Sequence, residues 1–309
     1  MVTRSSAHRP PSRAGVSPSR VVVPHGHWPT LLAFLSERFP AVDASVWSQR
    51  MAQGLVLSDL GLPLGVTQPC PHGQAVFYYR ETNQETRLPD QASIVFEDEH
   101  LLVADKPHFM PVTPGGRYLH TSLLVQLKQS TGLEELSPLH RIDRETAGLV
   151  VFSKRAQDRD AYQALFRHQQ VAKNYEAVAG FHPHLTLPLV YQSRIEEDEA
   201  FFVSREVAGE PNSQTRVSLI AKQGGLALYG LSPISGKRHQ LRIHMNALGL
   251  PMLGDQFYPK VLREPGQPED FSNPLQLLAK RIGFMDPLSG ESRQFESHMR
   301  LRWPRNLAQ

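Results

Sequence analysis

Short apolar segments dominate the chain after about residue 93, and their length restricts the fold more than any other feature of the sequence. Apolar runs of roughly four to eight residues bounded by turn residues are typical of β-strands. The first two runs are close enough together to predict a hairpin. The predicted strands cover residues 93–98, 101–107, 173–180, 215–222 and 226–235.

Two amphipathic stretches, residues 122–129 and 157–169, have helical spacing and lie between the predicted strands. Helices alternating with short strands that are joined partly by hairpins are typical of α+β proteins. We therefore predict an α+β domain over residues 93–309, with a mixed, mainly antiparallel central sheet and flanking helices.

The sequence before this domain predicts a smaller module. Two helices, the first starting after an N-cap at Thr30 and the second closed by Gly54, are followed by short strands. We expect these elements to form a compact unit at residues 25–80. The polar stretch 81–92, which contains Pro89, is the predicted linker to the larger domain.

Residues 1–24 contain no acidic residue and carry four arginines among Ser and Pro. This composition predicts a disordered basic tail, and the alternatives are an arm that contacts nucleic-acid backbone or a transit peptide. The net charge of +3 for 309 residues permits a polyanionic partner without requiring one. The four arginines are Arg4, Arg9, Arg13 and Arg20.

Cys70 is the single cysteine, which excludes a disulfide framework and a cysteine-based metal motif. We assign it no function and expect a reducing cytoplasm. No apolar run approaches the roughly 20 residues that a membrane helix needs, so we expect a soluble protein without a membrane partner.

Residues 235–255 predict a helix with Ser235 as its N-cap and Gly249 as its end. Arg238 and Arg242 are four residues apart and would share one face of this helix. Two neighbouring cations form either a solvated basic face or a pair of which one arginine reaches a carboxylate elsewhere. The apolar stripe of the helix consists of Leu241, His244, Met245 and Leu248.

Neither a metal nor another cofactor is predicted. His239 and His244 lie five residues apart with no carboxylate ligand at helical spacing, and we assign His244 to core packing. The sequence also has no Gly-rich phosphate loop.

Residues 138–154, "PLHRIDRETAGLVVFSK", place one carboxylate between two guanidinium groups just before an apolar strand. Asp143 is flanked by Arg141 and Arg144, and nearby cations favour the ionised form of a carboxylate. Such an aspartate is a poor general acid and a usable nucleophile or electrostatic partner. The alternative is a salt bridge that anchors a loop, and the charge spacing alone favours this alternative.

Four segments, in matching order and spacing, resemble the motifs of the RluA-type pseudouridine synthases. "HRIDRETAG" (140–148) is similar to the family's His-Arg-Leu-Asp-Arg signature, and residues 103–116 resemble its Lys-Pro strand. Residues 173–178 resemble its active-site tyrosine strand, and residues 235–255 its Gly-Arg-Thr-His-Gln-Ile-Arg helix ending in Leu-Gly-Asp.

The resemblance implies an enzyme that isomerises specific uridines in ribosomal or transfer RNA to pseudouridine, in a catalytic cleft and without a cofactor. It implies that Asp143 is the catalytic aspartate, that Tyr175 packs on the target base and that Arg242 pairs with the aspartate. We therefore expect these three groups to lie together. Arg141 would help to displace the target nucleotide and hold the RNA. Whether Asp143 attacks covalently or removes a ribose proton stays open.

Further basic residues are predicted to contact RNA, namely Arg144, Lys106, Arg238 and Arg50, with a structural role as the alternative for Lys106. Arg238 stands where the family usually carries Thr. The module at residues 25–80 resembles a degenerate S4 RNA-binding fold, in which Arg50 would be the contact.

Two rival functions share part of this sequence pattern. A protein kinase is suggested by "HRID", but Ile142 interrupts the kinase triplet and the other kinase motifs are missing. A non-catalytic RNA-binding protein on a synthase scaffold is the stronger rival, and retention of Asp143, Tyr175 and Arg242 argues against it. We expect a monomer with no obligatory protein partner.

Overall fold

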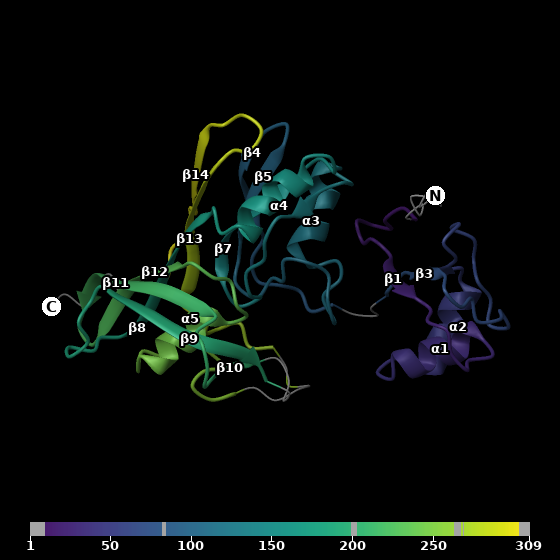
Figure 1. Cartoon of the computed structure of the whole chain (residues 1–309), viewed down its shortest axis with the longest axis horizontal. Helices are drawn as coiled ribbons and strands as arrows, with labels where there is room; N and C mark the ends of the chain where they lie inside the picture. The colour runs from purple at the N-terminus through teal and green to yellow at the C-terminus, as the bar shows by residue number, and fades with distance from the viewer. Residues whose placement is uncertain (1–9, 82–84, 199–202, 263–266, 268, 303–309) are drawn as a thin grey trace. The chain divides into compact units, whose positions relative to one another are not determined.

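The computed structural model describes residues 10–81, 85–198, 203–262, 267 and 269–302, and the chain divides into two units (Figure 1). The boundary after Thr86 lies within the predicted linker at residues 81–92. The first unit contains the residues up to Thr86 together with residues 114–120 and 125–134, and the second unit contains the others.

The first unit combines two short helices with a three-stranded antiparallel sheet in the order β1-β3-β2. The predicted N-cap of the first helix is confirmed, because Thr30 Oγ1 accepts a hydrogen bond from the Ala33 backbone N–H at 3.2 Å. Gly54, predicted to close the second helix, has a positive φ of 67°. The elements are β1 (Ser19–Val22), α1 (Leu31–Arg38), α2 (Ala44–Ala52), β2 (Val56–Leu57) and β3 (Ala75–Tyr78).

The predicted disordered tail at residues 1–24 is wrong for its last part. Ser19–Val22 form β1, which pairs with β3, and Val23 is fully buried in the core of this unit. The apolar run at residues 21–23 therefore completes the small sheet and its core, an effect that outweighs the basic and polar residues before it. Residues 1–9 lie outside the described residues.

The second unit contains most of the strands, and the predicted hairpin between β4 and β5 is confirmed. α3 (Leu123–Thr131) is shared between the two units. No helix in the described parts of the chain combines the length and apolar character needed to cross a membrane. The remaining elements are β4 (Ser93–Glu97), β5 (Leu101–Lys106), β6 (Ser137–Pro138), β7 (Ala147–Ser153), α4 (Arg159–Arg167), β8 (Ala172–Gly180), β9 (Leu189–Glu197), β10 (Ser204–Val207), β11 (Ser213–Gln223), β12 (Leu226–Pro233), α5 (Gln240–Ala247), β13 (Leu277–Met285) and β14 (Ser292–Glu296).

One sheet of 11 strands runs in the order β10-β9-β11-β12-β8-β13-β7-β5-β4, with β14 paired to β13 and β6 to β7. All of its pairs are antiparallel except that between β13 and β7. The predicted α+β class with a mixed, mainly antiparallel sheet is confirmed. The sequence did not predict β9, β10, β13 or β14, in part because charged residues interrupt their apolar positions.

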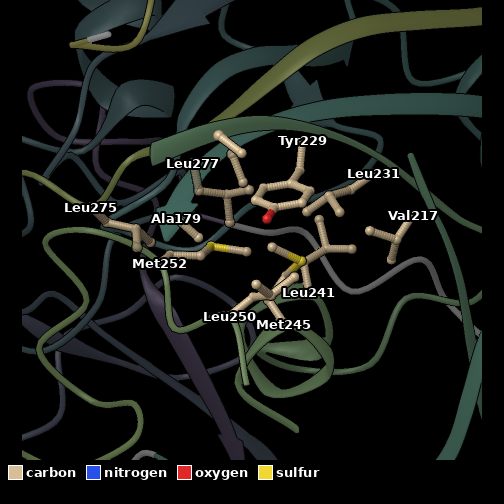
Figure 2. Packing of buried hydrophobic residues seen from close by; sticks show 12 residues of the cluster. Ala179, Val217, Tyr229, Leu231, Leu241, Met245, Leu250, Met252, Leu275 and Leu277 are labelled. Atoms are coloured by element: carbon tan, nitrogen blue, oxygen red, sulfur yellow. The ribbon is translucent and has the colours of Figure 1, made fainter. Parts of the chain in front are cut away.

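α5 packs its apolar side against the strands around the centre of this sheet. Figure 2 shows Leu241 and Met245 of the helix facing Tyr229 and Leu231 of β12. These side chains fix the rotation of the helix, because each is buried against the strands. Arg242 follows Leu241 directly, so the same packing determines where its guanidinium lies.

Gly148 of β7 lies where β7 pairs with β13. It pairs with Ala279 across the parallel β7–β13 contact, and its φ of 111° is one that other residues rarely adopt. A Cβ atom at this position would lie 2.3 Å from the Ala279 carbonyl oxygen. Only glycine lets β13 approach this closely.

We expect Gly148→Ala to lower the free energy of unfolding by about 3 kcal/mol, from backbone strain together with steric overlap. Urea denaturation of the two proteins measures this change. Gly180→Ala is the matched control, because Gly180 ends β8 in the same sheet and an added Cβ would meet nothing within 4 Å. Equal losses in both variants would contradict the steric account of the β7–β13 junction.

Candidate active site

One row of residues crosses the centre of the sheet and aligns three of the predicted segments. Tyr175 of β8 pairs with Leu231 of β12 and with Ala279 of β13. Ala279 pairs with Gly148 of β7, which in turn pairs with Lys106 of β5. The tyrosine strand and the Lys-Pro strand are therefore brought to the strand that follows the Asp143 turn.

α5 begins later than the sequence predicted. Its N-cap is His239, in the left-handed conformation with φ 55° and ψ 16°, and the predicted cap at Ser235 is wrong. Ser235 instead accepts a hydrogen bond from the Gln214 backbone N–H at 2.9 Å and donates one to Gln240 Oε1 at 2.8 Å. Gly249 follows the end of the helix with a φ of 75°, as predicted.

Arg242 is buried, with 1% of its surface exposed, and is held by a partner that the sequence analysis did not assign. Its Nε and Nη2 donate hydrogen bonds to the Asp255 carboxylate at 2.9 and 2.6 Å. Burial lowers the pKa of Arg242, but the hydrogen bonds and charge of Asp255 more than offset this and raise it. The guanidinium is therefore permanently charged.

Asp255 accepts further hydrogen bonds besides those from Arg242. Its Oδ1 also accepts hydrogen bonds from the backbone N–H groups of Phe257 at 2.9 Å and Tyr258 at 3.2 Å. The available sequence signal was the Leu-Gly-Asp end of residues 235–255, which was recognised without a role for its aspartate.

Asp143 lies beside Nη1 of Arg242, the guanidinium nitrogen that does not bind Asp255. Its Oδ2 is 3.6 Å from Arg242 Nη1, which confirms the predicted ion-pair distance, and its side chain is 27% exposed. Glu145 Oε2 lies 3.8 Å from the same nitrogen. Nη1 is buried and makes no hydrogen bond within the described part of the chain, so it serves two carboxylates at ion-pair range. The bidentate partner of Arg242 is Asp255, and Asp143 is its second anion.

Tyr175 is half-buried and packs against the apolar cluster that holds α5. Burial raises the pKa of the Tyr175 phenol, and the negative charge of Asp143 raises it further. The phenol is therefore neutral at physiological pH. The cleft predicted over these groups stays a prediction.

Lys106 and Arg144, which were predicted to contact RNA, do not have the exposed side chains that this role requires. Lys106 is fully buried and donates hydrogen bonds to the carbonyl oxygens of Pro107 at 2.9 Å and Arg144 at 3.1 Å. Burial lowers its pKa to about 7, against the opposing charges of Glu145 and Asp143. This position fits the structural alternative, in which Lys106 supports the backbone of the Asp143 turn.

Arg144 is partly buried and engaged within the protein. It forms ion pairs with Glu145 at 3.1 Å and with Glu269, and its guanidinium lies 5.7 Å from the centre of the Phe109 ring. These contacts tie the turn to its surroundings and do not present the guanidinium as a ligand for RNA.

The other predicted RNA contacts differ in exposure. Arg141 and Arg238 are exposed, and Arg141 forms no ion pair with any part of the chain that the structure describes. Arg50, in the first unit, is only 9% exposed and lies 5.0 Å from the centre of the Trp47 ring. Burial of Arg50 does not fit its predicted contact with RNA, whereas exposure fits that of Arg141 and Arg238.

His244 has the core position expected for it. It is fully buried, with Nε2 beside the hydroxyls of Ser193 and Ser213 and Nδ1 beside that of Thr215, and burial lowers its pKa to about 4. Within the described ranges, no cluster of three or more His, Cys, Asp or Glu side chains could hold a metal ion.

Comparison with known proteins matches the sequence and fold of the chain to a family. The profile of the family described as RNA pseudouridylate synthase matches residues 100–247. A Synechocystis protein named as an uncharacterized RNA pseudouridine synthase is 30% identical over 235 residues, which cover 74% of this chain and 79% of the relative. The dual-specificity RNA pseudouridine synthase RluA of Haemophilus influenzae is 30% identical over 226 residues, covering 68% and 94%. The solved structure of human RNA pseudouridylate synthase domain containing 1 aligns with a TM-score of 0.55 and 20% identity, covering 69% of this chain and 85% of that one, and shares the fold.

We expect Asp255→Asn to lower the free energy of unfolding by about 3 to 5 kcal/mol, because it leaves a buried guanidinium without its main anion. Urea denaturation measures the loss. In the control, Asp160→Asn removes the exposed ion pair between Asp160 and Arg167 and should change stability by less than about 1 kcal/mol. Equal stability of Asp255→Asn and wild type would show that Asp255 does not hold the arginine.

Proposed function

The chain belongs to the RluA-type family of RNA pseudouridine synthases and is an isomerase that acts on RNA, and we propose that Asp143 is its catalytic residue. The observation that supports this proposal is the approach of the Asp143 carboxylate to Arg242 Nη1 at 3.6 Å. A partly exposed carboxylate with a buried, permanently charged partner remains available to a substrate.

We propose that the target uridine is displaced from its stack before it reacts, because a stacked base is out of reach of a protein side chain. Arg141 is exposed and close in sequence to Asp143, which suits it to hold the displaced strand. Tyr175 would stack on the uracil. Such stacking contributes about 1 to 3 kcal/mol, which offsets much of the energy needed for displacement.

The reaction breaks the N-glycosidic bond of uridine, turns the uracil and forms a carbon–carbon bond to the same ribose. Asp143 either attacks covalently or removes a ribose proton, and both routes require the carboxylate form. Arg242, the neighbour of this carboxylate, keeps its own charge because a guanidinium is not deprotonated at physiological pH. The proposed chemistry needs only these side chains, and we propose that it uses no cofactor.

The proposed substrates are specific uridines in ribosomal or transfer RNA. One similar protein carries the name of a dual-specificity RNA pseudouridine synthase, which suits a site that accepts related structures in more than one RNA. We further propose that residues 25–80 form an S4-like module joined by a linker at residues 81–92 to a catalytic domain at residues 93–309.

We also propose that the enzyme works as a monomer in the cytoplasm and without an obligatory protein partner. Cys70 is a buried free thiol, the form that a reducing compartment maintains. A non-catalytic RNA-binding protein is the rival function. The combination of Asp143, Tyr175 and Arg242 at one site favours the enzyme, since RNA binding alone gives no reason to bury a charged arginine beside a carboxylate.

We expect Asp143→Asn to abolish the release of tritium from RNA labelled at uracil C5, because the new carbon–carbon bond at C5 displaces that hydrogen. The loss should be about a thousandfold or more. The assay uses labelled ribosomal and transfer RNA, with Asp160→Asn on α4 as the control that keeps wild-type release. Equal release by Asp143→Asn and wild type would remove Asp143 from the mechanism, and no release by wild type from either RNA would favour the binding protein.

We expect Arg141→Ala to weaken RNA binding and to reduce the slope of log K against log salt concentration by about 1, as loss of one phosphate contact does. Binding is measured with Asp143→Asn protein, so that no turnover interferes. Arg167→Ala is the control, because Arg167 is paired with Asp160 on α4. The same slope in all three proteins would exclude Arg141 from contact with the RNA backbone.

A further inference from the structure

His239 lies directly beside the proposed catalytic carboxylate and has no part in the reaction described above. Its Nε2 is 3.9 Å from Asp143 Oδ2, and its side chain is only 6% exposed. The ring stacks on Phe257, with 5.9 Å between the ring centres and 10° between the planes. The imidazole is therefore rigidly held with one edge facing Asp143.

The hydrogen bonds of Tyr258 determine which nitrogen of His239 carries the hydrogen. The Tyr258 hydroxyl has one hydrogen, which it donates to the Ser204 carbonyl oxygen at 2.9 Å, and it accepts from the Ser204 backbone N–H at 3.0 Å. His239 Nδ1 lies 3.0 Å from the same hydroxyl oxygen and must therefore donate to it. This network assigns the hydrogen of neutral His239 to Nδ1. Nε2 then carries the lone pair and is the atom that gains a proton, facing Asp143.

The backbone of His239 indicates that its side chain is needed at this place. With φ 55° and ψ 16°, it occupies the left-handed region, which few residues other than Gly adopt, although Asn, Asp and His do so more often than the rest. Its side chain makes no hydrogen bond to the first turn of α5, so it does not act as a conventional N-cap. A residue kept in a strained conformation without capping the helix is typical of functional sites.

The charged groups around His239 act in opposite directions. Burial is the largest influence and lowers its pKa from the usual 6.5. Asp143 and Glu145 favour the imidazolium, whereas Arg242 and Arg238 oppose it. The net effect is a pKa of His239 below 6.5, so the neutral form predominates at neutral pH. The Tyr258 hydroxyl keeps its hydrogen throughout this range, because its pKa is raised by burial.

Two neighbours make their closest approach to the same oxygen of Asp143. Arg242 Nη1 lies 3.6 Å from Oδ2, and His239 Nε2 lies 3.9 Å from it. Arg242 attracts Oδ2, and the stacked ring of His239 limits the rotation of the carboxylate. Both neighbours therefore act on Oδ2, and neither makes its closest approach to the other oxygen, Oδ1.

We infer that His239 is a positioning residue that, together with Arg242, fixes one oxygen of the Asp143 carboxylate and leaves the other to react. This inference rests on the proposed role of Asp143. Protonated His239 draws Oδ2 into a second ion pair, and the carboxylate is then less available for reaction. Activity therefore falls as the pH decreases through the pKa of His239.

His239→Asn tests this inference without changing the backbone or the bond to Tyr258. Asn adopts the left-handed conformation readily, and its amide N–H can replace Nδ1–H, whereas Nε2 is lost. We expect kcat for tritium release at neutral pH to fall by about tenfold, with KM unchanged, because a misplaced reacting group slows the chemical step. We also expect the fall in kcat below pH 6.5, present in wild type, to be absent in the variant.

His244→Asn is the matched control, because His244 is a buried histidine of the same helix that bonds to Ser193, Ser213 and Thr215. It should keep the wild-type kcat and the wild-type pH profile, whatever stability it loses. Unchanged kcat in His239→Asn would overturn the inference, and so would a lower kcat that keeps the fall below pH 6.5.

An NMR titration of the His239 ring provides a test that does not depend on activity. Asp143 raises the pKa of His239, so Asp143→Asn should lower that pKa relative to wild type. An unchanged pKa would overturn the inference even if His239→Asn failed to fold. If Asp143→Asn kept its tritium release, the proposed function would fail while the coupling of the two side chains could still be measured, so the two failures are distinguishable.

Discussion

Arg242 brings a positive charge into the protein interior, and the surrounding structure keeps that charge satisfied. A lone buried guanidinium would be strongly destabilising, and Asp255 prevents this with two hydrogen bonds at 2.9 and 2.6 Å. Asp255 in turn organises the loop after it through the backbone N–H groups of Phe257 and Tyr258. One ion pair therefore links α5 to the loop that packs beside His239.

The second consequence of this ion pair is electrostatic. With Nε and Nη2 committed to Asp255, Nη1 is the part of the guanidinium that faces Asp143 and Glu145. A bidentate bond to Asp143 would hold that carboxylate in the protein, whereas the 3.6 Å approach leaves it partly exposed. One cation is thus divided between a buried anion, Asp255, and a partly exposed one, Asp143.

Sequence reasoning succeeded where a local pattern carries the structure. The hairpin of β4 and β5, the N-cap at Thr30 and the end of α5 near Gly249 are all determined by short-range chemistry. The proximity of Asp143 and Arg242 came from motif resemblance, because no spacing rule joins residues so far apart in sequence. The register row from Tyr175 through Gly148 to Lys106 supplies the physical basis for bringing the motif segments together.

The sequence does not show where burial decides the role of a charged residue. From the sequence alone, a lysine or an arginine can be taken for an RNA contact. In the folded protein, Lys106 is fully buried and Arg50 is 9% exposed. β1 was missed for a related reason, since a short apolar run among basic residues becomes a strand only when β3 offers a partner. Exposure and pairing are properties of the folded chain that composition does not contain.

The start of α5 decides which of two arginines becomes part of the site. A helix beginning at Ser235 would place Arg238 and Arg242 on one face, but the left-handed His239 starts the helix at Gln240. The Gln240 side chain supports this start by accepting from the Lys237 backbone N–H at 3.0 Å and by donating to the Gln214 carbonyl oxygen at 3.0 Å. Arg238 therefore lies before the helix and is exposed, while Arg242 turns inward to Asp255. His239, which faces Asp143, thus also sets the start of α5 that brings Arg242 to Asp143.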